Sequence, residues 1–341
     1  MRGVGITPNL VSYGAAIDAC ARGRQCQRAL SLLEEMRGAG LAPNKVCYNA
    51  AMDACAEGAQ WQRALSLLRW MRGAGVTPNE VTYNAAIKAC ARGGQWQHAL
   101  SLLEEMRGEG VAPGQVSYNT AINACARVGQ WQPALSLLEE MSGAGITPDQ
   151  VSFTSAISAC SKGGQWKRAL SLLEQMGAVG VLPNRRSYGA AINACSKGGQ
   201  WQRALSLLEE MRGSGVAPDR FSYTAAINAC ARVGQWQRAL SLLEEMRAAG
   251  VAPDKVSYGA AIDACREGGQ WQRALSLVEG MPKAGVVPNS ICWRLAIRAC
   301  AEGGEPERAL SVLEEMRWAG IVPQKGRQEA NARGTSHGIM A

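Results

Sequence analysis

Basic residues recur at steps of 35 residues through the middle of the sequence. The series is Arg92, Arg127, Lys162, Lys197 and Arg232. The equivalent outer positions hold Arg22, Glu57, Glu267 and Glu302. A row of guanidinium and ammonium groups can neutralise successive phosphates of a nucleic acid, and such binding weakens steeply with salt. The alternative is a solvated face, where Lys and Arg side chains often lie.

The cysteines and histidines form no pattern typical of a metal site. Cysteine also recurs at 35-residue steps, as Cys20, Cys55, Cys90, Cys125, Cys160, Cys195, Cys230, Cys265 and Cys300, while Cys47 and Cys292 share another phase. Equivalent positions of stacked helical hairpins lie at least about 8–10 Å apart, and a disulfide needs Cα atoms within about 7 Å. There is no CxxC, and the only histidines are His98 and His337. We therefore expect small buried thiols in a reducing compartment and no bound metal.

Motifs of the common catalytic sites are missing from the sequence. It contains no GxxxxGK[ST], no GxSxG and no HxE followed by CxxC. These patterns would indicate phosphate binding, a serine nucleophile or a zinc deaminase, respectively. The sequence therefore predicts a binding protein, with no enzymatic activity and no cofactor.

A 35-residue unit repeats nine times without insertion or deletion and sets the spacing of these residues. The units start at residues 10, 45, 80, 115, 150, 185, 220, 255 and 290. In the third unit, apolar residues at helical spacing predict one helix over residues 81–92 and a second over residues 95–107. Gly93 and Gly94 separate the two helices, and Gly110 and Pro113 end the unit. Such hairpins bury their apolar faces only by stacking, which predicts an all-α solenoid.

Tryptophan forms another column, at the start of each second helix. Its members are Trp61, Trp96, Trp131, Trp166, Trp201, Trp236 and Trp271, with Cys26 and Pro306 at the same place in the outer units. Exposed aromatic rings could stack on bases. The neighbouring inward-facing leucines favour a packing role instead.

Composition and the chain ends bound the remaining possibilities. The net charge is +8 and the pI is about 9.0, which is compatible with nucleic-acid binding without proving it. No apolar run approaches the roughly 20 residues of a membrane helix. Met1–Gly5 matches Met36–Gly40, so we expect residues 1–9 to be the end of a preceding repeat, in a fragment or a chain opening at an internal Met. Residues 10–324 hold the nine repeats, and the polar residues 325–341 are expected to be a disordered tail.

The repeat resembles the pentatricopeptide repeat. The matching phrases are V-[ST]-Y-N-x-x-I-x-A-C, A-L-S-L-L-E-E-M and G-[VI]-x-P-[ND], over residues 5–324, and the uniform period resembles the pure class of that family rather than the 34-residue tetratricopeptide repeat. The resemblance implies a right-handed superhelical α-solenoid that binds single-stranded RNA, with about one nucleotide per repeat. It also implies a mitochondrial or chloroplast location and a part in RNA processing, stabilisation or translation. A monomer, with other RNA-processing proteins as further partners, is expected.

The resemblance also implies roles for particular residues. In this family, the residue after the first helix's aromatic and the residue after the closing proline choose the base. The corresponding residues are Asn49, Asn79, Asn84, Asn119, Asp149, Thr154, Asn184, Asp219, Thr224, Asp254 and Asn289. Their amide, hydroxyl and carboxylate groups can match a base edge. An apolar residue that wedges between bases would be Val46, Val81, Val116, Val151, Phe221 or Val256. The basic series falls on the family's phosphate-contacting position.

Some units depart from the family pattern. Gly14, Gly189 and Gly259 replace the first base-choosing residue, Gly114 leaves Asn84 without its partner, and Arg294 fits no known combination. Four units remain readable, and for repeats two to seven they imply the order pyrimidine, any base, U, A, any base, G. A protein- or peptide-binding scaffold is the alternative function, because helical solenoids also hold peptides.

Overall fold

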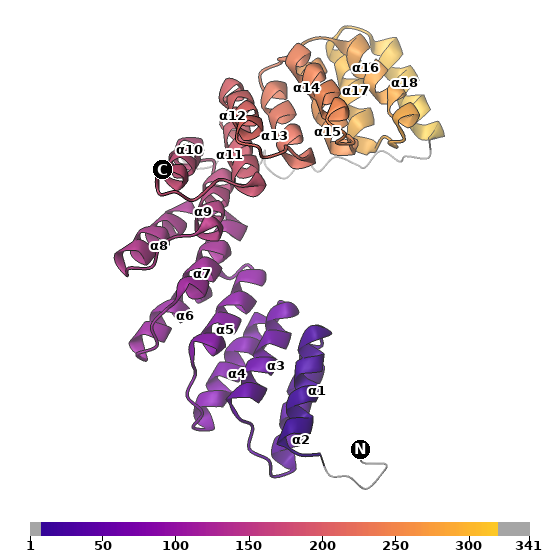
Figure 1. Ribbon diagram of the computed structural model, residues 1–341. Helices are drawn as coiled ribbons and strands as arrows, with labels where there is room; N and C mark the ends of the chain where they lie inside the picture. Colours follow the sequence, from indigo (N-terminus) through magenta and orange to yellow (C-terminus); the bar gives the residue numbers. More distant parts are fainter. Residues whose placement is uncertain (1–7, 320–341) are drawn as a thin grey trace, which may run out of the picture. The chain divides into compact units, whose positions relative to one another are not determined.

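The computed structural model describes residues 8–319, and every regular element in that range is a helix (Figure 1). The chain divides into two compact units, Met1–Gly198 and Gly199–Ala341. The expected remnant of a preceding repeat over residues 1–9 lies outside the described residues except for its last two positions. The expected tail over residues 325–341 lies wholly outside them.

The first unit contains eleven helices among its described residues. They are α1 (Leu10–Arg22), α2 (Cys26–Gly38), α3 (Lys45–Glu57), α4 (Trp61–Gly73), α5 (Glu80–Arg92), α6 (Trp96–Gly108), α7 (Gln115–Val128), α8 (Trp131–Gly143), α9 (Gln150–Lys162), α10 (Trp166–Ala178) and α11 (Arg185–Lys197). Odd-numbered helices are the first helices of the repeats, and each, as far as α9, packs against the next odd-numbered one. Each even-numbered helix, as far as α10, packs against its own hairpin partner and against the first helix of the next repeat. This serial packing confirms the predicted all-α solenoid.

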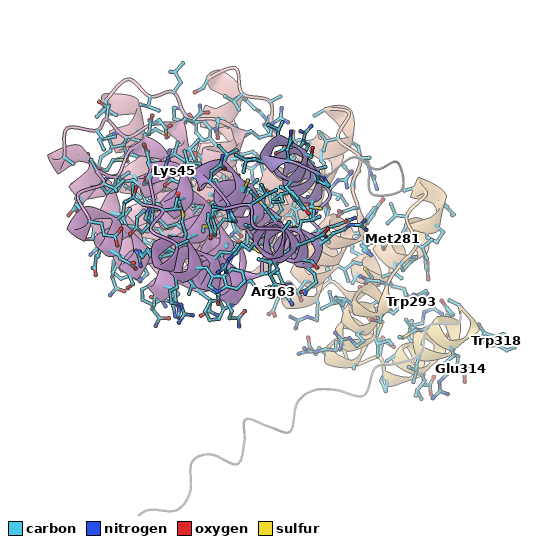
Figure 2. All side chains as sticks on the ribbon, turned by 90° about the horizontal axis from the view of Figure 1, so that it is seen from below. Lys45, Arg63, Met281, Trp293, Glu314 and Trp318 are labelled. Atoms are coloured by element: carbon cyan, nitrogen blue, oxygen red, sulfur yellow. A yellow bond between two sulfur atoms is a disulfide. The ribbon has the colours of Figure 1, made fainter. Side chains whose placement is uncertain are left out.

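The second unit continues the same pattern. Its described helices are α12 (Trp201–Gly213), α13 (Arg220–Ala231), α14 (Trp236–Ala248), α15 (Lys255–Glu267), α16 (Trp271–Gly280), the short 3-10 helix η2 (Pro282–Ala284), α17 (Ser290–Glu302) and α18 (Pro306–Trp318). Helix α16 is shorter than its equivalents because Pro282 follows it and cannot continue the α-helical hydrogen bonding. Trp318, at the end of α18, projects from the ribbon and is 90% exposed (Figure 2).

Helix ends follow the sequence signals closely. The predicted helices over residues 81–92 and 95–107 are α5 and α6, displaced by one residue at three of their four ends. Asn79 caps α5 because its side chain accepts a hydrogen bond from the Thr82 N–H. After α6, Gly110 adopts a φ of 76°, in the left-handed region that favours glycine, and its N–H reaches the Arg107 carbonyl.

The core of each repeat is built from the small and apolar columns. In the third repeat, Tyr83, Ile87 and Cys90 of α5 are fully buried, as is Met106 of α6. Alanines lie between them on α5 and are almost as inaccessible. Small side chains let adjacent first helices approach closely, which explains why an array with few aromatic residues still packs tightly.

Ion pairs join the second helices to the following repeat. Arg72 of α4 donates to the Tyr83 hydroxyl of α5 at 2.7 Å and pairs with Glu105 of α6. The same Arg–Tyr and Arg–Glu contacts occur at two other places, among Arg107, Tyr118 and Glu140 and among Arg212, Tyr223 and Glu245. Between the fourth and fifth repeats all three are replaced, by Ser142, Phe153 and Gln175. An apolar recess lies there instead of an ion pair.

The tryptophan column packs against the next repeat. Trp61 Cδ1 lies 2.5 Å from the place where a Cβ on Gly93 would stand, so only glycine fits beneath the ring. Trp131 meets Gly163 and Trp166 meets Gly198 in the same way. These contacts favour the packing role of the column over base stacking.

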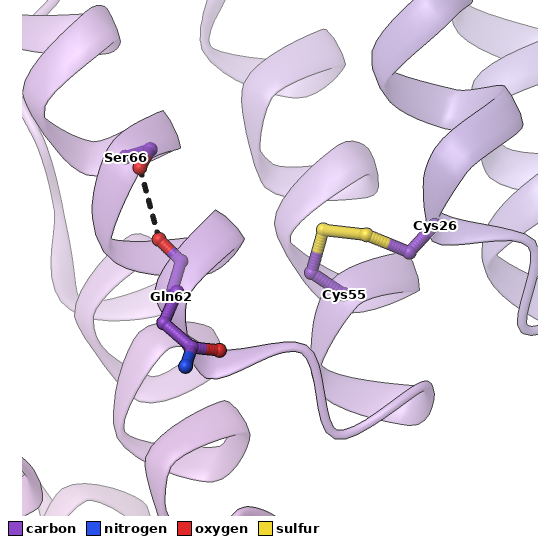
Figure 3. Close-up of a disulfide and its surroundings, with 4 residues drawn as sticks. All are labelled: Cys26, Cys55, Gln62 and Ser66. Carbon is purple, nitrogen blue, oxygen red and sulfur yellow. Dashed lines mark hydrogen bonds between the residues drawn. A yellow bond between two sulfur atoms is a disulfide. The ribbon is translucent and has the colours of Figure 1, made fainter.

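One prediction about the cysteines is wrong. Cys55 is not a free thiol but forms a disulfide with Cys26, and their Cα atoms are 4.7 Å apart (Figure 3). The prediction rested on the distance between equivalent positions of neighbouring repeats, and Cys26 and Cys55 are not equivalent positions. Cys26 occupies the tryptophan position of the first repeat, and this position faces the cysteine column of the second. The other cysteines of the two shared phases are buried free thiols, as predicted.

The described residues contain neither a membrane-spanning helix nor a metal-binding cluster. No helix between residues 8 and 319 combines the length and apolar character needed to cross a lipid bilayer. Within the same range, no group of three or more His, Cys, Asp or Glu side chains is arranged to hold a metal ion.

Candidate nucleic-acid interface

The second residue of each predicted base-reading pair is a helix N-cap. Asn79 caps α5, and its Oδ1 accepts the Thr82 N–H at 3.0 Å. Asp149, Asn184, Asp219, Asp254 and Asn289 cap α9, α11, α13, α15 and α17 in the same way. Capping occupies Oδ1, so the second side-chain atom, Nδ2 of Asn or Oδ2 of Asp, is the one that can meet a ligand.

The second-repeat pair is brought together by a hydroxyl group. Asn49 lies on α3 and Asn79 at the start of α5. Thr82 Oγ1 lies 2.7 Å from Asn49 Oδ1 and 2.8 Å from Asn79 Oδ1. Residues 30 positions apart in the sequence therefore share one hydrogen-bonding centre.

The fourth-repeat pair is in direct contact. Asn119 Nδ2 donates to Asp149 Oδ1 at 3.1 Å. Ser152 Oγ lies 2.5 Å from Asn119 Oδ1 and 2.9 Å from Asp149 Oδ1. Burial raises the pKa of Asp149, but hydrogen bonds from Ser152, Asn119 and the Val151 N–H outweigh it, so the pKa lies below its usual range. The carboxylate is thus held ionised.

The remaining pairs are less complete. Thr224 and Asp254 are bridged by Ser257, at 2.8 and 3.1 Å. Thr154 Oγ1 is buried without a hydrogen-bond partner, although Asn184, the other member of its pair, caps α11. Asn84 Oδ1 is likewise buried without a partner, which fits the loss of a side chain at Gly114. Asp219 and Asn289 cap their helices, and the first members of their pairs are Gly189 and Gly259.

The predicted wedge residues form exposed apolar columns on the first helices. Val46, Val81, Val116, Val151, Phe221 and Val256 are 53–68% exposed. Each stands three positions before the first base-choosing residue of its repeat, on the first turn of the helix. The sequence prediction missed Val11 and Ile291, which occupy the same position and are also exposed.

The basic series lies at the last turn of the first helices, or just after it at Arg232, but its members differ in surroundings. Arg127, Lys162 and Lys197 are exposed in the first unit, and Arg232 is exposed in the second. Lys162 Nζ donates to the carbonyl of Arg127 at 3.0 Å, which brings these two cationic residues of neighbouring repeats together.

Arg92 belongs to a different arrangement. It donates to Glu57 Oε2 at 2.6 Å, and Lys88 Nζ lies 2.9 Å from Glu57 Oε1. Hydrogen bonds from Lys88 and Arg92 lower the pKa of Glu57 to about 2. The third repeat therefore carries a neutralised part of the basic series, which the sequence prediction treated as fully available.

The hydroxyl groups that contact the predicted base-choosing residues are absent from the residues predicted to form the site. Thr82, Ser152 and Ser257 are fully buried. Their signal was present in the sequence as Asn or Asp followed three residues later by Ser or Thr, which is the spacing between an N-cap and the N3 position of a helix.

Family models match most of the described chain. The pentacotripeptide-repeat region of PRORP matches residues 1–148 and 82–247, and the PPR repeat matches residues 256–286 and 291–321. The first model alone covers more than half of the sequence. The chain belongs to the pentatricopeptide-repeat family.

Solved pentatricopeptide repeat structures share the fold. PPR10 in complex with an 18-nt psaJ RNA element is 23% identical, with a TM-score of 0.65 over 92% of this chain and 51% of that chain. PPR10 from maize is 22% identical, with a TM-score of 0.51 over 93% of this chain and 55% of that chain. The pentatricopeptide repeats described here therefore span about half of the length of those proteins. No curated protein sequence matches the chain significantly.

Proposed function

We propose that this chain binds single-stranded RNA along its first helices, with about one nucleotide per repeat. The observation that carries the proposal is the grouping of three kinds of residue on these helices. Hydrogen-bonding pairs such as Asn119 with Asp149 stand beside exposed valines, and cations such as Lys162 lie at the last turn. Polar pairs can read base edges, apolar side chains can separate bases, and cations can hold phosphates.

Family membership supports RNA as the ligand. The PPR10 structure of the same fold was obtained with an RNA element. The proposed order for repeats two to seven is pyrimidine, any base, U, A, any base, G. Gly189 and Gly259 present no side chain to a base, so their repeats accept any nucleotide.

The test is a selection of bound oligonucleotides from a random single-stranded RNA pool. Enrichment of pyrimidine-N-U-A-N-G is expected. Equal binding of duplex DNA, with no enriched sequence, would contradict base reading. In that case, binding of a peptide library to the chain would favour the scaffold alternative instead.

A second measurement separates phosphate holding from base reading. The logarithm of RNA affinity should fall linearly with the logarithm of salt concentration. Changing Arg92, Arg127, Lys162, Lys197 and Arg232 to Gln should lower that slope without changing which bases are preferred. An unchanged slope would remove these five residues from the phosphate-binding role.

We further propose that the bound RNA is a mitochondrial or chloroplast transcript, and that binding acts in its processing, stabilisation or translation rather than in catalysis by this chain. The proposal rests on family membership. Cross-linking in cells, followed by sequencing of the bound RNA, tests it: enrichment of nuclear transcripts only would contradict an organellar role.

A further inference from the structure

Three buried hydroxyl groups stand between the two members of a base-choosing pair. Thr82, Ser152 and Ser257 occupy the third position of α5, α9 and α15, and none of them is accessible to solvent. Each contacts the N-cap residue just before its own helix and the reading residue on the first helix of the preceding repeat. Because these groups are buried, they do not touch a base themselves.

Hydrogen bonds to Asp149 and Ser152 hold Asn119 in one orientation. Asn119 Oδ1 can only accept, so the Ser152 hydroxyl donates to it across 2.5 Å. On the other side, Asn119 Nδ2 donates to Asp149 Oδ1. An inverted amide would place its oxygen against the Asp149 carboxylate, acceptor facing acceptor. The carboxylate therefore selects the amide orientation, and the Ser152 hydroxyl, which can donate or accept, donates to the amide oxygen that this orientation turns towards it.

This orientation determines what the pair offers to a base. One hydrogen of Asn119 Nδ2 is used by Asp149, and the second remains as a donor. Asp149 Oδ1 is used by the Ser152 and Val151 N–H groups, which leaves Oδ2 as an acceptor. A donor beside a negatively charged acceptor complements the carbonyl and N3–H of uracil. It opposes the unprotonated N3 of cytosine.

In the sequence, the presence of this hydroxyl matches the presence of a reading side chain in every repeat from the first to the eighth except the sixth, where Gly189 is followed 33 residues later by Ser222. Ser or Thr follows each short polar reading residue of the second, third, fourth, fifth and seventh repeats. Where the reading residue is Gly14 or Gly259, the same position holds Cys47 or Cys292. A Cβ on these glycines would lie 3.8 Å from Cys47 Sγ and 4.0 Å from Cys292 Sγ. A thiol is a weak hydrogen-bond donor, and at these two places there is no side chain to orient.

We propose that Ser152, with Thr82 and Ser257 at the equivalent places, is a positioning residue that holds the reading residue of the preceding repeat in place and so maintains its donor and acceptor pattern. This inference rests on the proposed RNA-binding function. It assigns base discrimination to a residue that does not touch RNA, and it makes the selectivity of one repeat depend on a side chain of the next.

The first experiment measures discrimination at one nucleotide. RNA containing pyrimidine-N-U-A-N-G is compared with the same RNA carrying C in place of U, for the original chain, Ser152→Ala and Ser152→Thr. A site built around a hydrogen bond discriminates poorly once the bond is lost, so Ser152→Ala should reduce the U-over-C ratio about tenfold. Ser152→Thr keeps the hydroxyl and should retain the ratio. Discrimination at the A and G positions should remain as it was.

Ser222→Ala is the matched control. Ser222 makes the same cap contacts with Asp219, at 2.9 Å, but the reading position in the preceding repeat is Gly189. Both alanine variants lose the cap contact of the hydroxyl, and Ser152→Ala also loses the bond to Asn119, so thermal unfolding should show Ser152→Ala at least as destabilised as Ser222→Ala. Only Ser152→Ala should change base discrimination. If both variants, or neither, altered the U-over-C ratio, the positioning role would be wrong.

A second measurement needs no RNA. Selective ¹⁵N labelling of asparagine side chains follows the Asn119 amide by nuclear magnetic resonance. Ser152→Ala should accelerate hydrogen exchange of that amide by about tenfold, because its orientation is no longer held. Unchanged exchange would overturn the positioning role even if RNA binds. Changed exchange in a chain that binds no RNA would instead contradict the proposed function while leaving the orienting contact established.

Discussion

Two parts of the first unit use charge in different ways. Between the second and third repeats, ion pairs join first helix to first helix and second helix to second helix. Glu57 pairs with Lys88 and Arg92 on the first helices, and Arg72 pairs with Glu105 on the second helices. From the fourth repeat to the sixth, Arg127, Lys162 and Lys197 are exposed, and no carboxylate pairs with them among residues 8–319. The first region uses its ions to join repeats, while the second leaves its cations available to a ligand.

The difference shows that a repeated position has no fixed role. Arg92 and Arg127 occupy equivalent places at the ends of α5 and α7. The residue one repeat earlier decides what each can do: Glu57 stands before Arg92, and Arg92 stands before Arg127. In this column, Arg92 follows an acid and is ion-paired, whereas Arg127, Lys162 and Lys197 each follow a basic residue and pair with no carboxylate among the described residues.

The largest expected effect comes from removing the available cations. Arg127→Gln, Lys162→Gln and Lys197→Gln together should weaken RNA binding about 100-fold at low salt. The logarithmic salt slope should become shallower by about 2, because each phosphate contact on a single strand contributes about 0.7. Filter binding over a range of salt concentrations measures both quantities.

The control for this triple variant removes equal charge elsewhere. Arg28, Arg63 and Arg203 are exposed on second helices. Changing these three to Gln should shift the slope much less. Equal losses in the two triple variants would mean that only net charge matters and would remove the contrast between the two regions.

A smaller effect is expected from Glu57→Gln, which releases Lys88 and Arg92. A neutral amide cannot neutralise the two cations, so the third repeat should come to resemble the fourth to sixth repeats, in which the basic series pairs with no carboxylate in the described part of the chain. RNA affinity should rise about fivefold and the salt slope should steepen by about 1. Glu35→Gln removes an acid from a second helix and serves as the comparison; a similar gain there would point to net charge alone.

The tyrosine contacts provide a test on stability. Tyr83 is fully buried, and its hydroxyl donates to Glu109 at 2.7 Å and accepts from Arg72. Burial and the bond to Glu109 raise the pKa of Tyr83, so the hydroxyl stays protonated. Tyr83→Phe should lower the free energy of unfolding by about 1 kcal/mol in urea titrations. Phe153→Tyr should bring no matching gain, because Ser142 and Gln175 replace its ionic partners.

The smallest expected effect is a loss of stability at low pH, when Glu57 becomes protonated. The folded pKa of Glu57 is about 2, below the ordinary value of 4.5 for this side chain. Its contribution to stability is therefore fully present above pH 4.5 and is lost as the pH falls towards 2. Carboxyl ¹³C shifts should place the Glu57 titration near pH 2 in the original chain and clearly higher in Arg92→Gln. A midpoint near the usual value in the original chain would contradict the ion pairs.

The sequence alone determined the fold and the columns of this protein. Nine units of equal length keep every position in phase, so Asn119, Val116 and Arg127 could be assigned to one helix from periodicity and glycine breaks. Within one helix, spacing fixes the face on which a side chain lies, because an α-helix has a constant rise and turn.

Only the tertiary structure decided which columns meet. Glu57 reaches Arg92 across 35 residues, Ser152 reaches Asn119 across 33, and Cys26 reaches Cys55 across 29. The last two contacts join different columns of neighbouring repeats. Their occurrence depends on how far one hairpin is displaced and rotated against the next, and the repeat length does not specify that geometry.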